Sequence, residues 1–237
     1  MRIVIVGQGN VACNLQAAFA RKEIAAEMVS SRENLDQIPT NADVYIYAVR
    51  DAALQEVIEK VHVQARAVHL HTSGTLSLEV FGPDKPHCGV LYPFQSFSKA
   101  HILEDFSTVL IFIEAKGIDD ISAVYTLALT LTPHIYETTQ EDRERLHVAG
   151  VFANNFTNYM YTAAKELLRG THIPFSALLP LIDETAKKVH GLSPRDAQTG
   201  PAVRGDENVM QHHLELIQDE KIKELYRLVS ELIQNNP

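Results

Sequence analysis

The sequence is poor in cysteine, lacks long apolar runs and has fewer basic than acidic residues. Its two cysteines, Cys13 and Cys88, form neither a zinc-binding pattern nor a disulfide framework, which suits a reducing compartment. No apolar stretch approaches the ~18 residues of a membrane-spanning helix, and the first residues have none of the features of a signal peptide. We therefore expect a cytoplasmic protein that has no membrane partner.

The charge balance also argues against nucleic acid as a partner. The chain has 30 acidic and 21 basic residues, which gives a formal net charge of −9. Such a charge disfavours sequence-independent attraction to DNA, RNA or anionic lipid. We expect a small-molecule partner instead.

The first half of the chain alternates strand-like and helix-like segments. Five short runs are rich in valine, isoleucine and tyrosine: Arg2 to Val6, Glu27 to Ser30, Asp43 to Val49, Ala67 to His71 and Val109 to Glu114. Nearly continuous apolar strands, separated by crossover-length segments, are typical of a parallel sheet that is covered on both faces. The sequence therefore predicts an α/β fold with a doubly wound parallel sheet.

The second half is predicted to be helical throughout. Residues 141–170 form one long helical pattern that ends near Gly170, and its ~28 residues would span roughly 40 Å. Further helices are expected at about Pro174 to His190 and at Glu207 to Leu232, the latter broken near residues 218–220. We expect an α/β domain at residues 1–140 and a helical domain at residues 141–237.

A helical wheel at about 100° per residue gives the long helix two faces. We expect the apolar face to be core and the opposite face to be polar. The apolar face comprises Ala149, Phe152, Phe156, Met160, Ala163 and Leu167, and the polar face comprises His147, Asn154, Asn158 and Lys165.

The segment "VGQGNVA" has the form GxGxxA, directly after a strand and before a helix. In a dinucleotide-binding turn the first glycine (Gly7) allows the bend and the second (Gly9) lets the backbone approach a pyrophosphate. The small third residue (Ala12) lets the helix pack on the sheet. Gln8, Asn10 and Val11 complete this predicted phosphate-binding turn. The alternative is a strand-to-helix turn with no ligand.

The end of the second strand indicates which nucleotide binds. An NAD site normally offers a carboxylate there, whereas this chain offers Ser30, Ser31 and Arg32. A guanidinium suits a phosphate monoester, so we predict NADP as the cofactor. In the alternative, Arg32 is a solvated loop residue.

Two later strand ends should lie over the same cofactor, because ligands of open α/β sheets bind beyond the carboxyl ends of the strands. One end comprises Ala48, Val49, Arg50 and Asp51, and the other comprises Thr72, Ser73 and Gly74. The backbone and the hydroxyl of Ser73 are expected near the nicotinamide. His69 and His71 share a strand face but have no further ligand at a suitable spacing, so we expect no metal.

Four segments carry a family resemblance that covers essentially the whole chain: "HTSGTLSLEVF", "GVLYPFQSFSK", "LHVAGVFANNF" and "TGPAVRGD". The sequence resembles a family of Rossmann-like proteins that have a C-terminal domain of unknown function. The chain also resembles the wider superfamily of 6-phosphogluconate dehydrogenase, ketopantoate reductase and pyrroline-5-carboxylate reductase. The resemblance implies NADP binding, a helical domain like the C-terminal domain of 6-phosphogluconate dehydrogenase, and a homodimer built on that domain.

The chain departs from these relatives at one position. Relatives that act on ketones or hydroxy acids commonly carry a lysine four residues before an asparagine of the long helix. Counting back from Asn155 gives Val151. The imine-reducing relatives do not use that lysine, so its absence is compatible with a C=N substrate.

Four residues are candidate catalytic groups, because hydride transfer to a substrate requires a proton donor. His147, Asn154 and Asn155 lie on the long helix, and His71 lies beside the predicted nicotinamide loop. Histidine is the usual side chain for general acid catalysis near neutral pH, so His147 suits that role. A solvated helix face is the alternative for the three helical residues.

Four further residues are candidates for substrate binding. Pro93 and Gln95 follow a predicted strand, and Thr199 and Arg204 stand in the loop "AQTGPAVRGDENV". Arg204 could clamp a carboxylate or phosphate, or it could brace a loop carboxylate such as Asp206. Asp206 is itself expected to cap the following helix.

Together these features predict an NADPH-dependent oxidoreductase that reduces a small C=O or C=N substrate in the cleft between the two domains. The alternative is a catalytically silent NADP-binding regulatory or sensor dimer, favoured by the missing lysine.

Overall fold

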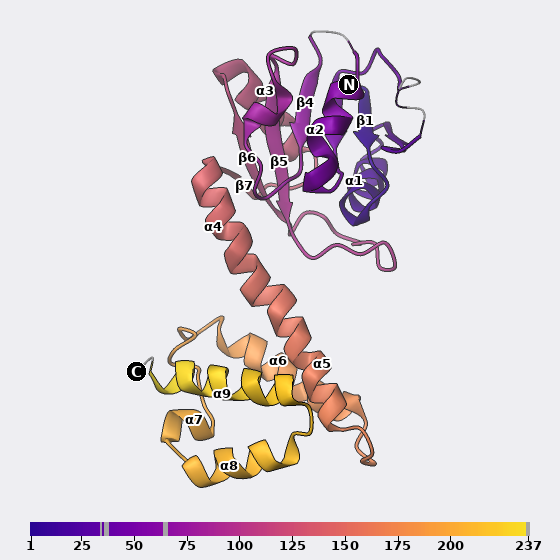
Figure 1. Ribbon diagram of the computed structural model, residues 1–237. Coiled ribbons are helices and arrows are strands. Elements are labelled where there is room, and N and C mark those ends of the chain that lie inside the picture. Colours follow the sequence, from indigo (N-terminus) through magenta and orange to yellow (C-terminus); the bar gives the residue numbers. More distant parts are fainter. Residues whose placement is uncertain (34, 36–37, 64–65, 236–237) are drawn as a thin grey trace. The chain divides into compact units, whose positions relative to one another are not determined.

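The computed structural model describes residues 1–33, 35, 38–63 and 66–235 (Figure 1). The chain divides into two compact units, Met1–Asn154 and Asn155–Pro237. The first is an α/β unit, and the second contains helices and no strand in its described residues. The predicted domain boundary after residue 140 falls at the start of helix α4 (Gln140–Gly150), which belongs to the α/β unit.

A seven-stranded sheet forms the centre of the α/β unit in its described residues, with the order β2-β1-β3-β4-β5-β6-β7 (Figure 1). All neighbouring strands are parallel except the pair β5 and β6. The strands are β1 (Ile3–Val6), β2 (Ala26–Val29), β3 (Val44–Tyr47), β4 (Val68–His71), β5 (Cys88–Phe94), β6 (Leu110–Ala115) and β7 (Ile135–Glu137).

One pair of neighbouring strands, β5 and β6, departs from the predicted parallel sheet because it is antiparallel. A parallel neighbour requires a crossover connection, usually a helix, whereas no helix lies between β5 and β6. The prediction also placed Pro93 after a strand, but Pro93 lies within β5, opposite Ile111. The doubly wound α/β class is confirmed.

Helices cover both faces of the sheet. On one face α1 (Asn10–Arg21) and α3 (Ile118–Leu129) share a buried apolar cluster with the strands. On the other face α2 (Asp51–Lys60) and the short helix η2 (Leu78–Phe81) share a second cluster. Side chains of β1 alternate between the two clusters, and all four are fully buried. Burial on both faces explains the nearly continuous apolar strands in the sequence.

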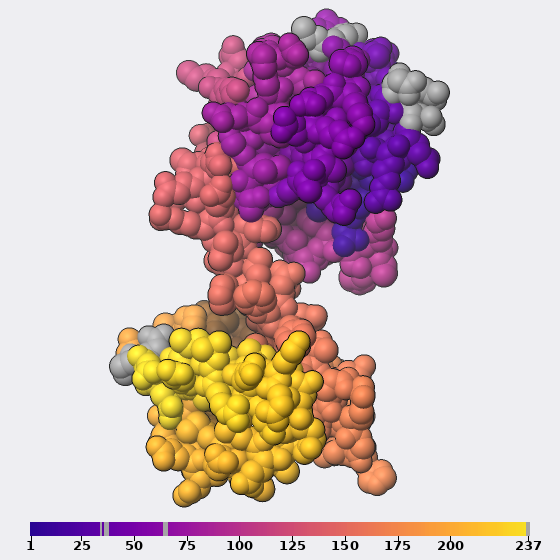
Figure 2. Space-filling view, in the orientation of Figure 1, coloured from indigo at the N-terminus to yellow at the C-terminus, as the bar shows by residue number. Residues whose placement is uncertain are grey.

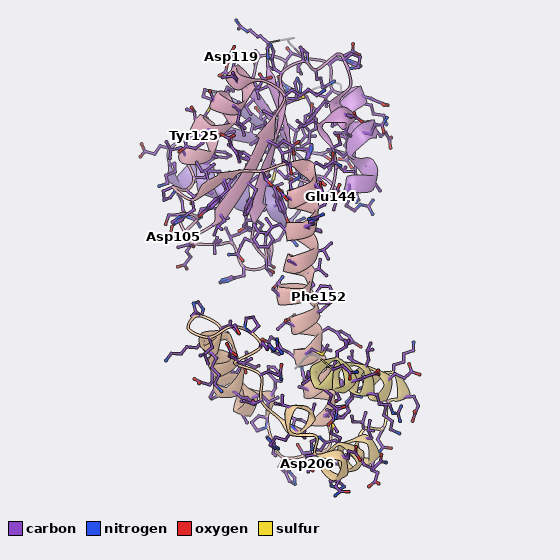
Figure 3. All side chains as sticks on the ribbon, turned by 90° about the vertical axis from the view of Figure 1, so that its left-hand side faces the viewer. Asp105, Asp119, Tyr125, Glu144, Phe152 and Asp206 are labelled. Carbon is purple, nitrogen blue, oxygen red and sulfur yellow. The ribbon has the colours of Figure 1, made fainter. Side chains whose placement is uncertain are left out.

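The helical unit begins within the long helix and continues to the end of the chain. Its last two helices are separate, so the predicted break is confirmed. Asp206 accepts a hydrogen bond from the backbone N–H of Val209 and caps α8, as expected (Figure 3). Gly170, with φ +84°, follows the end of α5. The helices are α5 (Thr157–Leu167), η4 (Phe175–Leu178), α6 (Leu179–Lys188), α7 (Pro201–Arg204), α8 (Glu207–Leu216) and α9 (Glu220–Gln234).

The long helix is not a uniform α-helix, because residues Val151–Phe156 (η3) form π-helical turns between α4 and α5. A π-turn contains more residues than an α-turn, so the face that follows it is rotated from its place on a uniform wheel. The stripe predicted to be core is largely exposed in the chain. Phe152, which is labelled in Figure 3, is 64% exposed, and Leu167 is 50% exposed. The expectation that this stripe lies in the core of the chain is therefore wrong.

No helix in the described parts of the chain combines the length and the apolar character that crossing a membrane would require.

Candidate functional site

The glycine turn after β1 has the geometry expected of a phosphate-binding turn. Gly7 has φ +129°, and a β-carbon built there would lie 2.3 Å from the carbonyl oxygen of Ala48. Gly9 is the N-cap of α1 and has no side chain to shield the first helical N–H groups. Ala12 is fully buried in the core between α1 and the sheet. The turn thus presents backbone N–H groups and the positive end of the α1 dipole.

A cleft of about 860 Å³ lies at this turn, and every residue that lines it belongs to the α/β unit. It opens beyond the carboxyl ends of β1, β2, β3 and β4. The strand order changes direction between β1 and β3, and ligands of open α/β sheets bind at such a point. Of the predicted residues, the following line it: Gly7, Gln8, Gly9, Asn10, Val11, Ser30, Ser31, Arg32, Ala48, Val49, Arg50, Thr72, Ser73, Gly74, Pro93, Gln95 and His147.

The segment after β2 brings the hydroxyl groups of Ser30 and Ser31 and the guanidinium of Arg32 to the cleft. The backbone N–H of Arg32 donates to Oγ of Ser30 at 3.2 Å, which folds this segment into a tight turn. The Arg32 side chain is exposed and lines the cleft. Lys60 lines it too, but its Nζ lies 2.5 Å from Oε1 of Glu56. Arg32 is therefore better placed than Lys60 to meet an anion.

The loop after β4 is held by the carboxylate of Asp51, which belongs to a strand end that the sequence placed over the cofactor. Oδ2 of Asp51 accepts from Oγ of Ser73 at 2.9 Å and from Oγ1 of Thr75 at 2.7 Å. Oγ of Ser73 also accepts from the backbone N–H groups of Thr75 and Leu76. The Ser73 hydroxyl thus faces Asp51 and shapes the loop, and its place near a nicotinamide stays a prediction.

His71 supports the same loop from inside the protein. It is fully buried, and its Nδ1 accepts from the backbone N–H of Ser73 at 3.2 Å. Burial, with a smaller contribution from the charge of Arg143, lowers the pKa of His71 to about 3. His71 does not line the cleft. A neutral, buried imidazole is not a direct proton donor to a ligand there, so that candidate role is corrected.

His147 is paired with a tyrosine at the wall of the cleft. Oη of Tyr92 lies 2.8 Å from Nδ1 of His147, and both residues line the cleft. A β-carbon at Gly74 would lie 2.5 Å from the same Nδ1, so only glycine lets the loop approach this closely. Burial raises the pKa of Tyr92 to about 12. The phenol therefore stays protonated near neutral pH.

A buried arginine fixes α4, and with it His147, on the sheet. Arg143 is fully buried, pairs with the carboxylate of Glu114 in β6 and donates to the carbonyl oxygen of Leu76. Glu114 stands opposite Val90, which in turn stands beside His71 in the sheet register. Arg143 thus ties the start of α4 to β6 and to the loop after β4, one helical turn before His147.

The remaining candidates do not line the cleft. Asn154 and Asn155 are exposed and stand where the two units divide, and Thr199 and Arg204 belong to the helical unit. Their roles stay predictions. Asp51 also lines the cleft. Tyr92 and Lys99 line it too and were not predicted as site residues, although both stand in the segment "GVLYPFQSFSK" that carries the family resemblance.

The chain is similar to several solved structures. With the putative NADP oxidoreductase from Bacteroides fragilis it shares 38% identity over 99% of this chain and 98% of that one, with a TM-score of 0.93. A Thermotoga maritima protein matches at 21% identity over 98% and 97% of the two chains, with a TM-score of 0.71. The imine reductase from Myxococcus stipitatus, in complex with NADP+, matches at 12% identity over 99% and 92%, with a TM-score of 0.61. The latter two likenesses show the fold alone.

These comparisons place the molecule among the Rossmann-type oxidoreductase folds that have a helical C-terminal part. The family described as a domain of unknown function, DUF2520, matches residues 109–233. The chain belongs to this family. No curated protein matches it.

Proposed function

We propose that this protein is an NADPH-dependent oxidoreductase that reduces a small C=O or C=N substrate. One observation carries the proposal: the glycine turn, the Ser30–Arg32 segment and the loop after β4 line a single cleft. Support comes from the Bacteroides fragilis relative, which is named an NADP oxidoreductase, and from the imine reductase, which binds NADP+.

The cleft fits a dinucleotide in shape and in chemistry. A β-carbon at Gly9 would meet only the carbonyl oxygen of Ala48, at 3.8 Å, so the space beside the turn is open for a diphosphate. Arg32 would hold the phosphate monoester that distinguishes NADP from NAD. Gly74 and the Tyr92–His147 pair would border the nicotinamide. When bound, the nicotinamide supplies the hydride.

The Tyr92–His147 pair suits delivery of the accompanying proton. Oη of Tyr92 lies 2.8 Å from Nδ1 of His147. When the imidazole of His147 is protonated, Nδ1–H can donate to this oxygen and the proton on Nε2 can pass to the substrate, which leaves a neutral imidazole. We assign His147 as the proton-delivering group and Tyr92 as the group that orients its ring. Because Val151 stands where the lysine of ketone-reducing relatives is expected, an imine substrate remains compatible with this site.

The first test is cofactor preference. We expect NADPH to raise the melting temperature more than NADH does, because Arg32 meets a phosphate that only NADPH carries. Arg32→Asp should lower NADPH affinity about tenfold or more and erase the difference, since a charged hydrogen bond contributes about 1.5–3 kcal/mol. Equal shifts with the two coenzymes in the unaltered protein would remove Arg32 from the site.

The second test is turnover. We expect NADPH fluorescence to fall during incubation with at least one member of a panel of keto acids and cyclic imines. Steady fluorescence with every compound, despite tight NADPH binding, would favour the catalytically silent regulatory dimer instead.

We further propose that two copies of the chain associate through the helical unit. Within its described residues, only two hydrophobic side chains, Ala202 and Ile217, are buried. The surface of α9 carries exposed leucines, and this helix lies on the outside of the unit (Figure 2). Exposed large apolar side chains of the unit include Met160, Leu167, Leu181, Leu228 and Leu232.

A second copy is the partner best suited to cover these side chains, because a large exposed apolar surface marks an interaction site. We expect sedimentation at micromolar concentration to report twice the 26.4 kDa mass of the chain. A monomer mass under those conditions would contradict the dimer.

A further inference from the structure

The segment that follows β5 is fastened to the start of α1 by a buried asparagine. Asn14 is 1% exposed, and its Nδ2 donates to the carbonyl oxygens of Asn10 at 2.9 Å and Ser98 at 3.1 Å. Its Oδ1 accepts from the backbone N–H of Leu103 at 2.9 Å. Both donors and the acceptor of the amide are thus used. Asn14 joins the first turn of α1 to two points of the segment.

A second asparagine, Asn10, fixes Lys99, which lies between Ser98 and Leu103 in this segment. Oδ1 of Asn10 accepts from the backbone N–H of Lys99 at 3.1 Å. Asn10 is the first residue of α1, where the helix directs unpaired N–H groups and its positive dipole end toward a ligand. The Lys99 backbone is therefore held beside the predicted diphosphate-binding turn, although the two residues are 89 positions apart in the chain.

The side chain of Lys99 lines the same cleft as Gly9 and Asn10. It is exposed, and among the described carboxylates none forms an ion pair with its Nζ. Lys60, which also lines the cleft, pairs with Glu56. Lys99 thus offers a positive charge at the start of α1. The diphosphate of a bound nucleotide, which carries two negative charges, would lie there.

We infer that Lys99 binds the diphosphate of the nucleotide and that Asn10 and Asn14 position it. The inference rests on the proposed function, because it assumes that a nucleotide occupies the cleft. It assigns separate phosphate groups to two of the cations that line the cleft. Arg32 meets the phosphate monoester on the ribose, and Lys99 meets the diphosphate that NADPH, NADH and ADP have in common.

The test uses four probes that separate these two phosphate sites: NADPH, NADH, ADP and adenosine 2′-monophosphate. Lys99→Gln should weaken NADPH, NADH and ADP by the same factor, about fivefold to twentyfold at low salt, and leave the monophosphate unchanged. Arg32→Gln should weaken NADPH and the monophosphate and leave NADH and ADP unchanged. Calorimetry, with displacement of NADPH for the weaker probes, measures all four affinities.

Lys22→Gln is the matched control, because Lys22 is an exposed lysine at the opposite end of α1. It makes the same charge change and should alter no affinity. An unchanged affinity of Lys99→Gln for all four probes, with normal binding by the parent protein, would overturn the inference and leave the proposed function standing. Failure of the parent protein to bind any probe would overturn the proposed function itself.

A separate measurement tests whether Asn14 positions Lys99. Asn14→Ala should weaken ADP binding in the parent protein but not in the Lys99→Gln background, because its effect passes through Lys99. A merely structural asparagine would weaken ADP binding by the same factor in both backgrounds. That additive result would remove Asn14 from the inference.

Discussion

Gly7→Ala is expected to lower the free energy of unfolding by about 3 kcal/mol or more and to abolish NADPH binding. A residue with a side chain is rarely found at φ +129°, and such strain costs on the order of 1–3 kcal/mol. The new β-carbon would also stand 2.3 Å from the Ala48 carbonyl oxygen, a backbone atom that moves only if β3 moves. Urea denaturation and NADPH titration measure the two effects.

Gly9→Ala is the matched control for the turn. Gly9 has φ −79°, which an alanine adopts readily, and its β-carbon would lie 3.8 Å from the nearest atom. Stability should therefore change by no more than about 0.5 kcal/mol. NADPH affinity should nevertheless fall about tenfold or more, because the methyl group occupies the space in which the diphosphate approaches the backbone. Normal NADPH binding by either variant would place the diphosphate elsewhere.

Arg143→Met is expected to destabilise the protein by about 3–5 kcal/mol, since removing one partner leaves a buried charge uncompensated. The carboxylate of Glu114 would lose its partner, and the carbonyl oxygen of Leu76 would lose a donor. The start of α4 would lose its attachment to the sheet at the same time. Denaturant unfolding measures the change in stability, and hydrogen exchange of the α4 amides measures the loss of attachment.

Arg145→Met gives the comparison on the same helix. Arg145 pairs with Glu141, but both side chains are about three-quarters exposed, at 75% and 74%. Exposed pairs contribute about 0–1 kcal/mol, so this variant should be nearly as stable as the parent. Similar losses of stability in Arg143→Met and Arg145→Met would mean that the buried ion pair of Arg143 contributes no more to stability than an exposed one. A second substitution, Glu114→Leu, should recover part of the stability lost in Arg143→Met.

The phosphate-binding turn could be predicted from the sequence because its determinants are contiguous. Gly7, Gly9 and Ala12 act within one strand-turn-helix unit, and each role depends on local backbone geometry or on the size of one residue. The strand ends at Ser30–Arg32, Ala48–Arg50 and Thr72–Gly74 could be assigned to the same edge for a similar reason. Parallel strands in one sheet bring their carboxyl ends together, whatever the details of packing.

The faces of the long helix were harder to predict. The wheel assumed a constant angle per residue, whereas the π-helical turns at Val151–Phe156 shift the register. His147 was placed on the polar face opposite the predicted core, yet it lies against Tyr92 and Gly74 of the α/β unit. Which elements surround a helix is a tertiary property, and the helix's own pattern does not contain it.

By itself, therefore, the sequence determined the α/β class, the glycine turn and the residues at three further strand ends, because these follow from short-range geometry and from the alternation of strands and helices. Only the tertiary structure decided which side chains meet at the cleft wall. Tyr92 and His147 are 55 positions apart, and Asn10 and Lys99 are 89 apart. Such pairs form only when the strands and helices pack, since contacts between distant residues depend on the arrangement of the whole sheet and its helices.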